Sequence, residues 1–176
     1  MKHKATYRKT IKQLKDMTVK LGAGESKIID AGSVKTAAWV RYKCQFGCSG
    51  FGDTLTCPPY SPTPGETQKI LDCFQEAIII HCHGNSHADV SEIVLKIEEE
   101  AFLAGYHKAL AMGAGPCRLC AECNTKGECR NREKTRPSME ACGIDVFTTA
   151  RNNGFTIDTL HSSGCKADYF GIVLIK

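Results

Sequence analysis

Four cysteines lie within thirteen residues of this 176-residue chain, and their spacing constrains the fold more than any other feature. They are Cys117, Cys120, Cys123 and Cys129, in the pattern C-x2-C-x2-C-x5-C. Three thiolates spaced three residues apart on a loop can converge on one side of a compact metal centre. The fourth thiolate completes the ligand set after a turn at Gly127. Bacterial ferredoxins hold cuboidal iron–sulfur clusters with a similar C-x2-C-x2-C run. The loop is therefore predicted to bind a [4Fe–4S] cluster.

Two alternatives stay open for this four-cysteine loop. The first is zinc, although zinc sites usually take two C-x2-C pairs from separate knuckles with a longer spacer between them. The second is a set of reduced thiols that bind no metal.

A second group of cysteines, Cys44, Cys48 and Cys57, follows the pattern C-x3-C-x8-C. Three glycines in this stretch allow a tight loop to fold round a metal, and a proline directly follows the last cysteine, as it does at ferredoxin ligands. Three cysteines leave the site incomplete. Either Cys82, Cys142 or Cys165 completes it, or one metal position stays open to water, sulfide or substrate, as catalytic metal sites generally do. The alternative is a glycine-rich surface loop with reduced thiols.

The remaining cysteines and the histidines have simpler interpretations. Cys73, Cys82 and Cys142 are expected in the core, where cysteine behaves as a small hydrophobe, while Cys165 lies in an expected turn. The histidines His81, His83 and His87 form a local group, and the first two face the same side of an expected strand. A metal pair is conceivable there, but the sequence favours histidines that simply end an apolar strand at a sheet edge.

Composition places limits on the compartment and the partners. Eleven cysteines cannot all pair with one another, and no apolar signal-peptide region follows the first nine residues. No apolar stretch approaches the ~18 residues of a membrane span. A reducing cytoplasm with metal-bound thiolates accounts best for these features. The net charge of +4 is too small and too scattered to indicate nucleic-acid binding, and the oligomeric state stays open.

Helical and strand-like patterns alternate along the chain, which predicts a single α/β domain over residues 1–176. We expect an α+β sandwich in which helices pack on a small mixed sheet and two cysteine-rich loops bind metal. The expected helices cover residues 4–21, a stretch that begins with the capping box Thr63–Glu66, residues 90–105 and residues 138–152. The expected strands cover residues 27–31, 77–81, 108–112, 155–160 and 169–175, with the last two antiparallel, and a further apolar segment lies around residues 37–42.

Basic residues surround the four-cysteine loop: Arg118, Lys126, Arg130, Arg132, Lys134 and Arg136. Cations and backbone N–H groups stabilise the negative charge of a thiolate-bound cluster and raise its reduction potential. The segment Gly113–Gly115 is a candidate source of such N–H groups. The basic residues also suit a docking face for an acidic electron-transfer protein, and the ordinary alternative is a solvated charged loop.

The order of these motifs resembles that of a microbial family labelled "predicted metal-binding protein", a cysteine-rich domain of unknown function. The similar stretches are Arg41–Pro59, Gly113–Arg130 and Arg136–Ala141, and the resemblance runs from about Val40 to the C-terminus. Two positions depart from the family pattern: Phe51 replaces a more usual tyrosine, and Cys142 replaces a typical aromatic residue. The resemblance implies metal ligation by Cys44, Cys48, Cys57, Cys117, Cys120, Cys123 and Cys129, and it implies no reaction.

Three function hypotheses follow from these patterns. The first is a [4Fe–4S] protein, with one cluster or two, that acts as a redox or electron-transfer module. The second is an enzyme that uses an open iron at Cys44, Cys48 and Cys57 on a small substrate. The third is a structural zinc-binding domain for protein interactions. Catalytic residues and the question of enzymatic activity stay open at this point.

Overall fold

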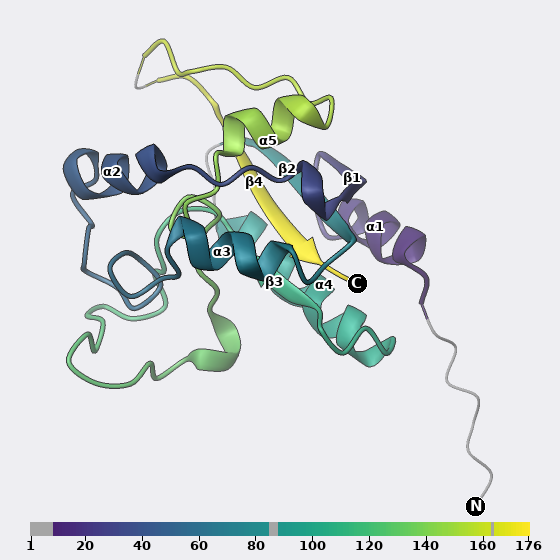
Figure 1. Ribbon diagram of the computed structural model, residues 1–176, viewed down its shortest axis with the longest axis horizontal. Helices are drawn as coiled ribbons and strands as arrows, with labels where there is room; N and C mark the ends of the chain where they lie inside the picture. The colour runs from purple at the N-terminus through teal and green to yellow at the C-terminus, as the bar shows by residue number, and fades with distance from the viewer. Residues whose placement is uncertain (1–8, 85–87, 163) are drawn as a thin grey trace, which may run out of the picture.

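The computed structural model describes residues 9–84, 88–162 and 164–176, and its centre is a four-stranded sheet (Figure 1). The strands are β1 (Glu25–Asp30), β2 (Glu76–Gly84), β3 (Leu110–Met112) and β4 (Ala167–Leu174), and they lie in the order β1-β2-β4-β3. The α/β fold class is confirmed, but every neighbouring pair of strands is antiparallel, whereas a mixed sheet was expected. The reason lies in β4, which inserts between β2 and β3. Those two strands run in the same direction and would otherwise form the parallel pair that a strand–helix–strand unit predicts.

Helices cover both faces of the sheet. On one face lie α1 (Ile11–Lys20) and α4 (Ala88–Leu103), and on the other lie α3 (Pro64–Leu71) and α5 (Val146–Asn152). Side chains of a strand alternate between the two faces, so Ile78 and Ile80 of β2 pack with α1 and α4, while Ile79 packs with α3 and α5. This burial on both sides explains the continuous apolar run in β2. No helix in the described part of the chain is long and apolar enough to cross a membrane.

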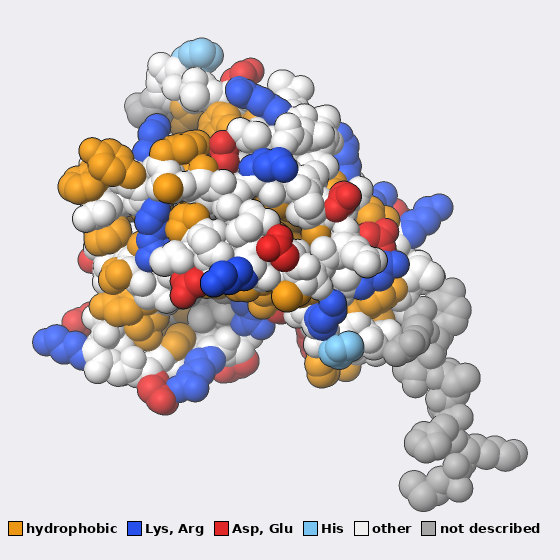
Figure 2. All heavy atoms as spheres, in the orientation of Figure 1, with side chains coloured by type: hydrophobic (Ala, Val, Ile, Leu, Met, Phe, Trp, Pro, Cys, Tyr) orange, Lys and Arg blue, Asp and Glu red, His pale blue; other side chains and the backbone are white. Residues whose placement is uncertain are grey.

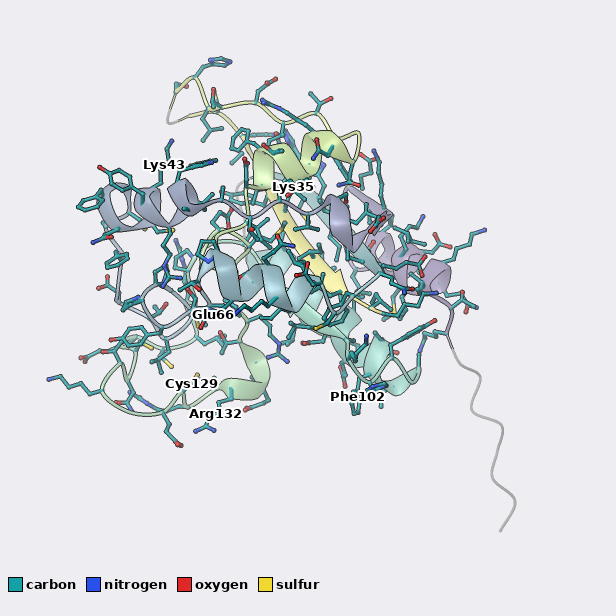
Figure 3. All side chains as sticks on the ribbon, viewed as in Figure 1. Lys35, Lys43, Glu66, Phe102, Cys129 and Arg132 are labelled. Carbon is teal, nitrogen blue, oxygen red and sulfur yellow. The ribbon has the colours of Figure 1, made fainter. Side chains whose placement is uncertain are left out.

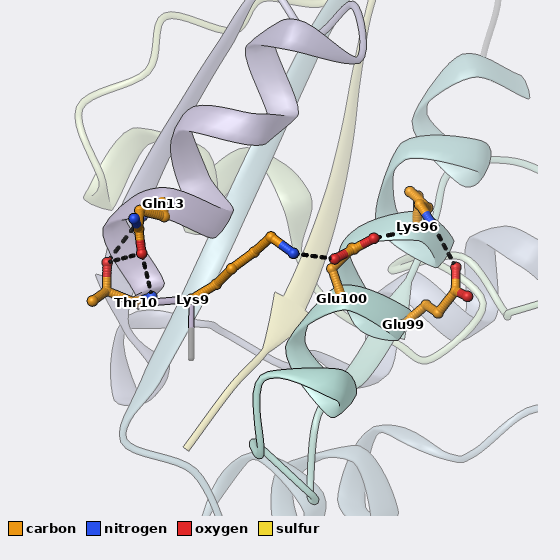
Figure 4. A network of polar contacts seen from close by, with 6 residues as sticks. All are labelled: Lys9, Thr10, Gln13, Lys96, Glu99 and Glu100. Atoms are coloured by element: carbon orange, nitrogen blue, oxygen red, sulfur yellow. Dashed lines mark hydrogen bonds and ion pairs between the residues drawn. The ribbon is translucent and has the colours of Figure 1, made fainter. Parts of the chain in front are cut away.

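Capping boxes fix the starts of two helices. Thr63 accepts a hydrogen bond from the Glu66 backbone while the Glu66 carboxylate accepts one from the Thr63 backbone, so the predicted start of α3 is confirmed. Thr10 and Gln13 form the same arrangement at α1, which starts later than expected, and residues 4–8 of the expected helix lie outside the described residues. Figure 4 shows this box beside the ion pair between Lys9 Nζ and Glu100 Oε2, at 2.6 Å, which joins the start of α1 to α4.

The helix α2 (Ala38–Gly47) lies at the margin of the fold and was not predicted as a helix. Only Val40 of this helix is buried. Trp39, Tyr42 and Phe46 are exposed, and Figure 2 shows hydrophobic side chains gathered at the edge where Figure 1 places α2. Because the apolar residues of α2 do not form a single core-facing stripe, the periodicity that identifies most helices is weak here.

Near the C-terminus, the expected helix over residues 138–152 is confirmed only in its second half, and the expected strand over residues 155–160 is wrong. The segment 138–145 folds as tight turns, and α5 begins only at Val146, after the N-cap Asp145. Gly143 has φ +76 and lies so close to α3 that a Cβ there would be 2.4 Å from Pro64 Cγ, so this turn requires glycine. Residues 155–160 lie outside the sheet, although Phe155 and Ile157 are buried in the core. The apolar pattern of that segment reflects burial of a loop.

Candidate metal centre

The four-cysteine loop follows β3 directly and lies beside the loop that connects α2 to α3, in the lower left of Figure 1. A cavity of about 530 Å³ lies between the two loops and is lined by all four cysteines and by the segment Gly52–Thr56. Each of the four cysteines is half-buried. Figure 3 shows Cys129 on this loop, close to Arg132 in the 3-10 turn η2 (Arg132–Lys134).

Three N–H groups donate hydrogen bonds to sulfurs of this loop. The Leu55 backbone N donates to Cys123 Sγ at 3.4 Å, and the Asn131 backbone N donates to Cys129 Sγ at 3.4 Å. The Asn131 side-chain Nδ2 donates to Cys120 Sγ at 3.1 Å. Such donors stabilise thiolates and tune the metal they bind. The sulfurs of Cys120, Cys123 and Cys129 therefore lie in surroundings suited to negative charge.

The sequence pointed to different donors. The Gly113 N–H, one of the candidate donors in the segment Gly113–Gly115, donates instead to Pro137 O at 2.9 Å and so holds β3 to the returning chain. Nothing local in the sequence identifies Leu55 as a donor, because it reaches Cys123 only through the packing of two distant loops. For Asn131, the one available signal was an amide side chain two residues after Cys129.

A partly buried ion pair anchors the end of the four-cysteine loop. Arg136 Nε donates to Glu98 Oε2 at 2.7 Å, and Glu98 Oε1 accepts from the backbone N of Ala111 in β3 at 3.1 Å. Of the other basic residues, Arg132 pairs with Glu128, and Arg118, Lys126, Arg130 and Lys134 are exposed. Arg136 is thus held in place at the base of the loop, and the other basic side chains are exposed to solvent.

The second cysteine group lies at the end of α2 and in the loop that follows. Cys44 occupies the last turn of α2, Cys48 is its C-cap residue, and Cys57 lies in the following loop. The Arg41 guanidinium holds that loop in place, because it donates to the carbonyl oxygens of Pro62 at 2.8 Å, Ser61 at 3.1 Å and Pro59 at 3.3 Å. The sequence motif included Arg41 but gave it no role, and in the structure it joins α2, which carries Cys44, to the segment that follows Cys57.

Electrostatics near Cys44 favour a bound cation. Burial raises the pKa of the Cys44 thiol, and the neighbouring Cys48, Glu140 and Cys57 raise it further. Burial also raises the pKa of Glu140, whose Oε2 is buried with no hydrogen-bond partner among the described residues. The Cys44 thiol faces the Glu140 carbonyl at 4.0 Å. Several acidic groups therefore share a partly buried place, where a metal ion would compensate their charge.

A cavity of about 650 Å³ adjoins the second cysteine group. Its lining includes Cys44, Cys48, Glu140, Arg151 and Asp168. This volume is of the size that small-molecule sites usually have. A metal held at Cys44 and Cys48 would be accessible from this cavity.

The other four cysteines differ in burial. Cys82 and Cys142 are buried, as predicted, and burial raises the pKa of the Cys142 thiol to about 12. The prediction that Cys73 lies in the core is wrong: it is exposed just after α3, and its thiol donates to Lys69 O at 3.3 Å. Cys165 is exposed in a turn and contacts Ser162.

The structure also brings His81 and His83 together with Asp168. Each histidine has a ring nitrogen 2.8 Å from Asp168 Oδ1. The burial of Asp168 would raise its pKa, but hydrogen bonds from His83 and His81 outweigh that effect and lower the pKa of the carboxyl. His87, the third histidine of the sequence group, lies outside the described residues.

Comparison with known proteins gave a match at the level of the family. A search of curated proteins and a search of solved structures gave no match. A model of the family described as "Predicted metal-binding protein (DUF2284)" matches residues 27–175, which include both cysteine groups, the Arg41 motif and the segment from Arg136 onward. The chain belongs to this family of predicted metal-binding proteins.

Proposed function

We propose that the chain is an iron–sulfur protein whose four-cysteine loop binds a [4Fe–4S] cluster and transfers electrons. The observation that carries the proposal is the cavity of about 530 Å³ lined by Cys117, Cys120, Cys123 and Cys129, three of which receive N–H hydrogen bonds on sulfur. Iron–sulfur clusters take four thiolates, and hydrogen bonds to their sulfurs set the reduction potential.

The spacing of the sulfurs supports a cluster over a single zinc ion. In a tetrahedral zinc site made of four thiolates, bonds of about 2.3 Å put the sulfurs about 3.8 Å apart. Among the described residues, the one group with three or more potential ligand atoms within 4.8 Å of one another is His81, His83 and Asp168, so no three cysteine sulfurs are that close. A cuboidal cluster holds its thiolates farther apart than one ion does, so it does not require three sulfurs this close together.

The two cysteine groups lie close enough to suggest electron exchange between them. Leu55 donates to Cys123 and stands two residues before Cys57 in the chain. Two residues span at most about 7 Å of extended backbone, so Cys57 lies near the four-cysteine loop. An acidic redox protein could dock at the exposed basic residues of the four-cysteine loop and donate an electron there. That electron would then have a short path to a second centre at Cys44, Cys48 and Cys57.

The test compares Cys129→Ser with Cys73→Ser, each purified without oxygen. Cys73 is a matched control because it is an exposed cysteine outside both groups. We expect Cys129→Ser to lose about four irons per chain together with the visible absorption of the cluster, while Cys73→Ser retains both. Equal iron content in the two variants would contradict the assignment. If Cys129→Ser instead released zinc, the structural zinc alternative would replace it.

A second candidate function is an enzyme that binds a small substrate at an open metal position. The cavity of about 650 Å³ beside Cys44 and Cys48 favours it, because three protein ligands and an open position are typical of catalytic metal sites. The test adds a small anion such as azide to the reduced protein and follows its electron paramagnetic resonance. A change in the signal of wild type that is absent in Cys44→Ser supports the open position. An unchanged wild-type signal favours electron transfer alone.

A further inference from the structure

The strand pairing places two histidines and a carboxylate on the same face of the sheet. His81 and His83 are two residues apart on β2, so their side chains leave the same face. Asp168 of β4 is the direct antiparallel partner of His83, and Phe170 is the partner of His81. Residues directly opposite in an antiparallel pair also share a face. Three side chains of types that can ligate a metal therefore converge as a consequence of register.

The distances within this histidine–aspartate cluster suit one metal ion. His81 Nε2 and His83 Nδ1 are both 2.8 Å from Asp168 Oδ1, and the three atoms all lie within 4.8 Å of one another. Bonds of about 2.1 Å put neighbouring ligand atoms about 3.0 Å apart in an octahedral set and about 3.4 Å apart in a tetrahedral one. The 2.8 Å between Asp168 Oδ1 and each histidine nitrogen is close to the octahedral spacing, so an adjustment of the side chains would admit the ion.

The surrounding residues hold His81 in place and leave His83 accessible to solvent. The His81 ring stacks on Phe170 at 4.6 Å between centroids and meets the edge of Phe155 at 5.9 Å. The His83 side chain is 56% exposed, so an ion can reach the cluster from solvent and keep water as a further ligand. Asp168 is partly buried and also lines the cavity beside Cys44 and Cys48.

We propose that His81, His83 and Asp168 form a metal site, separate from the cysteines, that binds one divalent transition-metal ion such as Zn²⁺. Two imidazoles and a carboxylate are ligands for zinc and its neighbours in the first row, whereas Mg²⁺ and Ca²⁺ prefer oxygen ligands alone. Three protein ligands leave positions open, and an ion there would stand at the same cavity as the Cys44 group. This site does not depend on the iron–sulfur proposal, because none of its ligands is sulfur.

The test titrates Co²⁺, a coloured substitute for Zn²⁺, into anaerobic holoprotein whose cysteine sites keep the metal present at purification. The variants are His83→Ala and Asp168→Asn, and the matched control is His107→Ala, which removes an exposed histidine elsewhere. We expect wild type and His107→Ala to bind one additional Co²⁺ per chain without sulfur-to-cobalt charge-transfer absorption. Loss of an outer-shell partner alone weakens a metal site roughly 10–100-fold, so either ligand variant should weaken binding at least that much.

Four results would overturn the proposal. Wild type could bind no additional cobalt, which would leave a hydrogen-bonded His–Asp–His cluster without metal. The bound cobalt could show thiolate absorption, or His83→Ala could bind as tightly as wild type, and either result would place the ion elsewhere. Circular dichroism and unchanged metal content at the cysteines verify that each variant is folded. A tenfold excess of Mg²⁺ should leave the cobalt in place, and displacement by Mg²⁺ would contradict imidazole ligation.

Discussion

Asn131 illustrates how one side chain adjusts the four-cysteine loop. Its Nδ2 group donates to Cys120 Sγ, and this bond stabilises the more negative, reduced state of a cluster. Asn131→Ala should therefore lower the reduction potential on the order of tens of millivolts, measured by redox titration of the visible spectrum. Asn124→Ala is the control, because the Asn124 amide donates to the Glu128 carbonyl of the same loop. An equal shift of the reduction potential in both variants would mean that disorder of the loop, and not the lost bond to Cys120, causes the effect.

Cys142 illustrates a cysteine whose role is packing. It is fully buried in the core on the sheet face that α3 and α5 cover, and burial raises the pKa of its thiol to about 12, so it behaves as a small hydrophobe. Cys142→Ala should retain all of its iron while its free energy of unfolding falls by about 1 kcal/mol. Metal analysis and thermal melting measure the two effects. Loss of iron in this variant would make Cys142 the fourth ligand of the Cys44 group.

At the scale of elements, α2 and the following loop form one unit that Arg41 joins. Its guanidinium is the common donor to the carbonyls of Pro59, Ser61 and Pro62. Arg41→Ala should release this loop, displace Cys57 and reduce metal occupancy at the Cys44 group, with a loss of about 1 kcal/mol in stability because partly buried carbonyls lose their donor. The four-cysteine loop has its own anchor, the Arg136–Glu98 pair, and should keep its metal.

The control for this prediction is Lys43→Ala, which removes a cation from the same helix without touching those carbonyls. Lys43 contacts the exposed Trp39 ring, 5.8 Å from its centroid. We would measure the metal content and the melting temperature of each variant. These measurements distinguish the loss of the Arg41 hydrogen bonds to the loop from the loss of one positive charge on α2. Equal metal loss in Arg41→Ala and Lys43→Ala would contradict the role given to Arg41.

At the scale of the whole molecule, the sequence predicts local features well and assembly poorly. The capping box at Thr63, the apolar run of β2 and the periodicity of α4 are local signals, and the structure bears them out. The insertion of β4 between β2 and β3 depends on which strands pair, and periodicity does not record this. The helical state of α2 was also missed, since its aromatic face packs on no core.

The candidate site divides in the same way. Cysteine spacing identifies the two groups, because ligands on one loop must be near one another in sequence. The donors Leu55 and Asn131, the loop tie at Arg41 and the meeting of Asp168 with two histidines arise from tertiary contacts. No spacing rule in a single sequence predicts such contacts between segments so far apart.

The most direct test of the central claim is the iron and acid-labile sulfide content of wild-type protein purified without oxygen. A [4Fe–4S] cluster at the four-cysteine loop predicts about four irons and four sulfides per chain, and a second cluster at the Cys44 group raises both to about eight. The protein should be brown in either case. One or two zinc ions per chain with no sulfide would contradict the iron–sulfur account and leave a structural zinc protein.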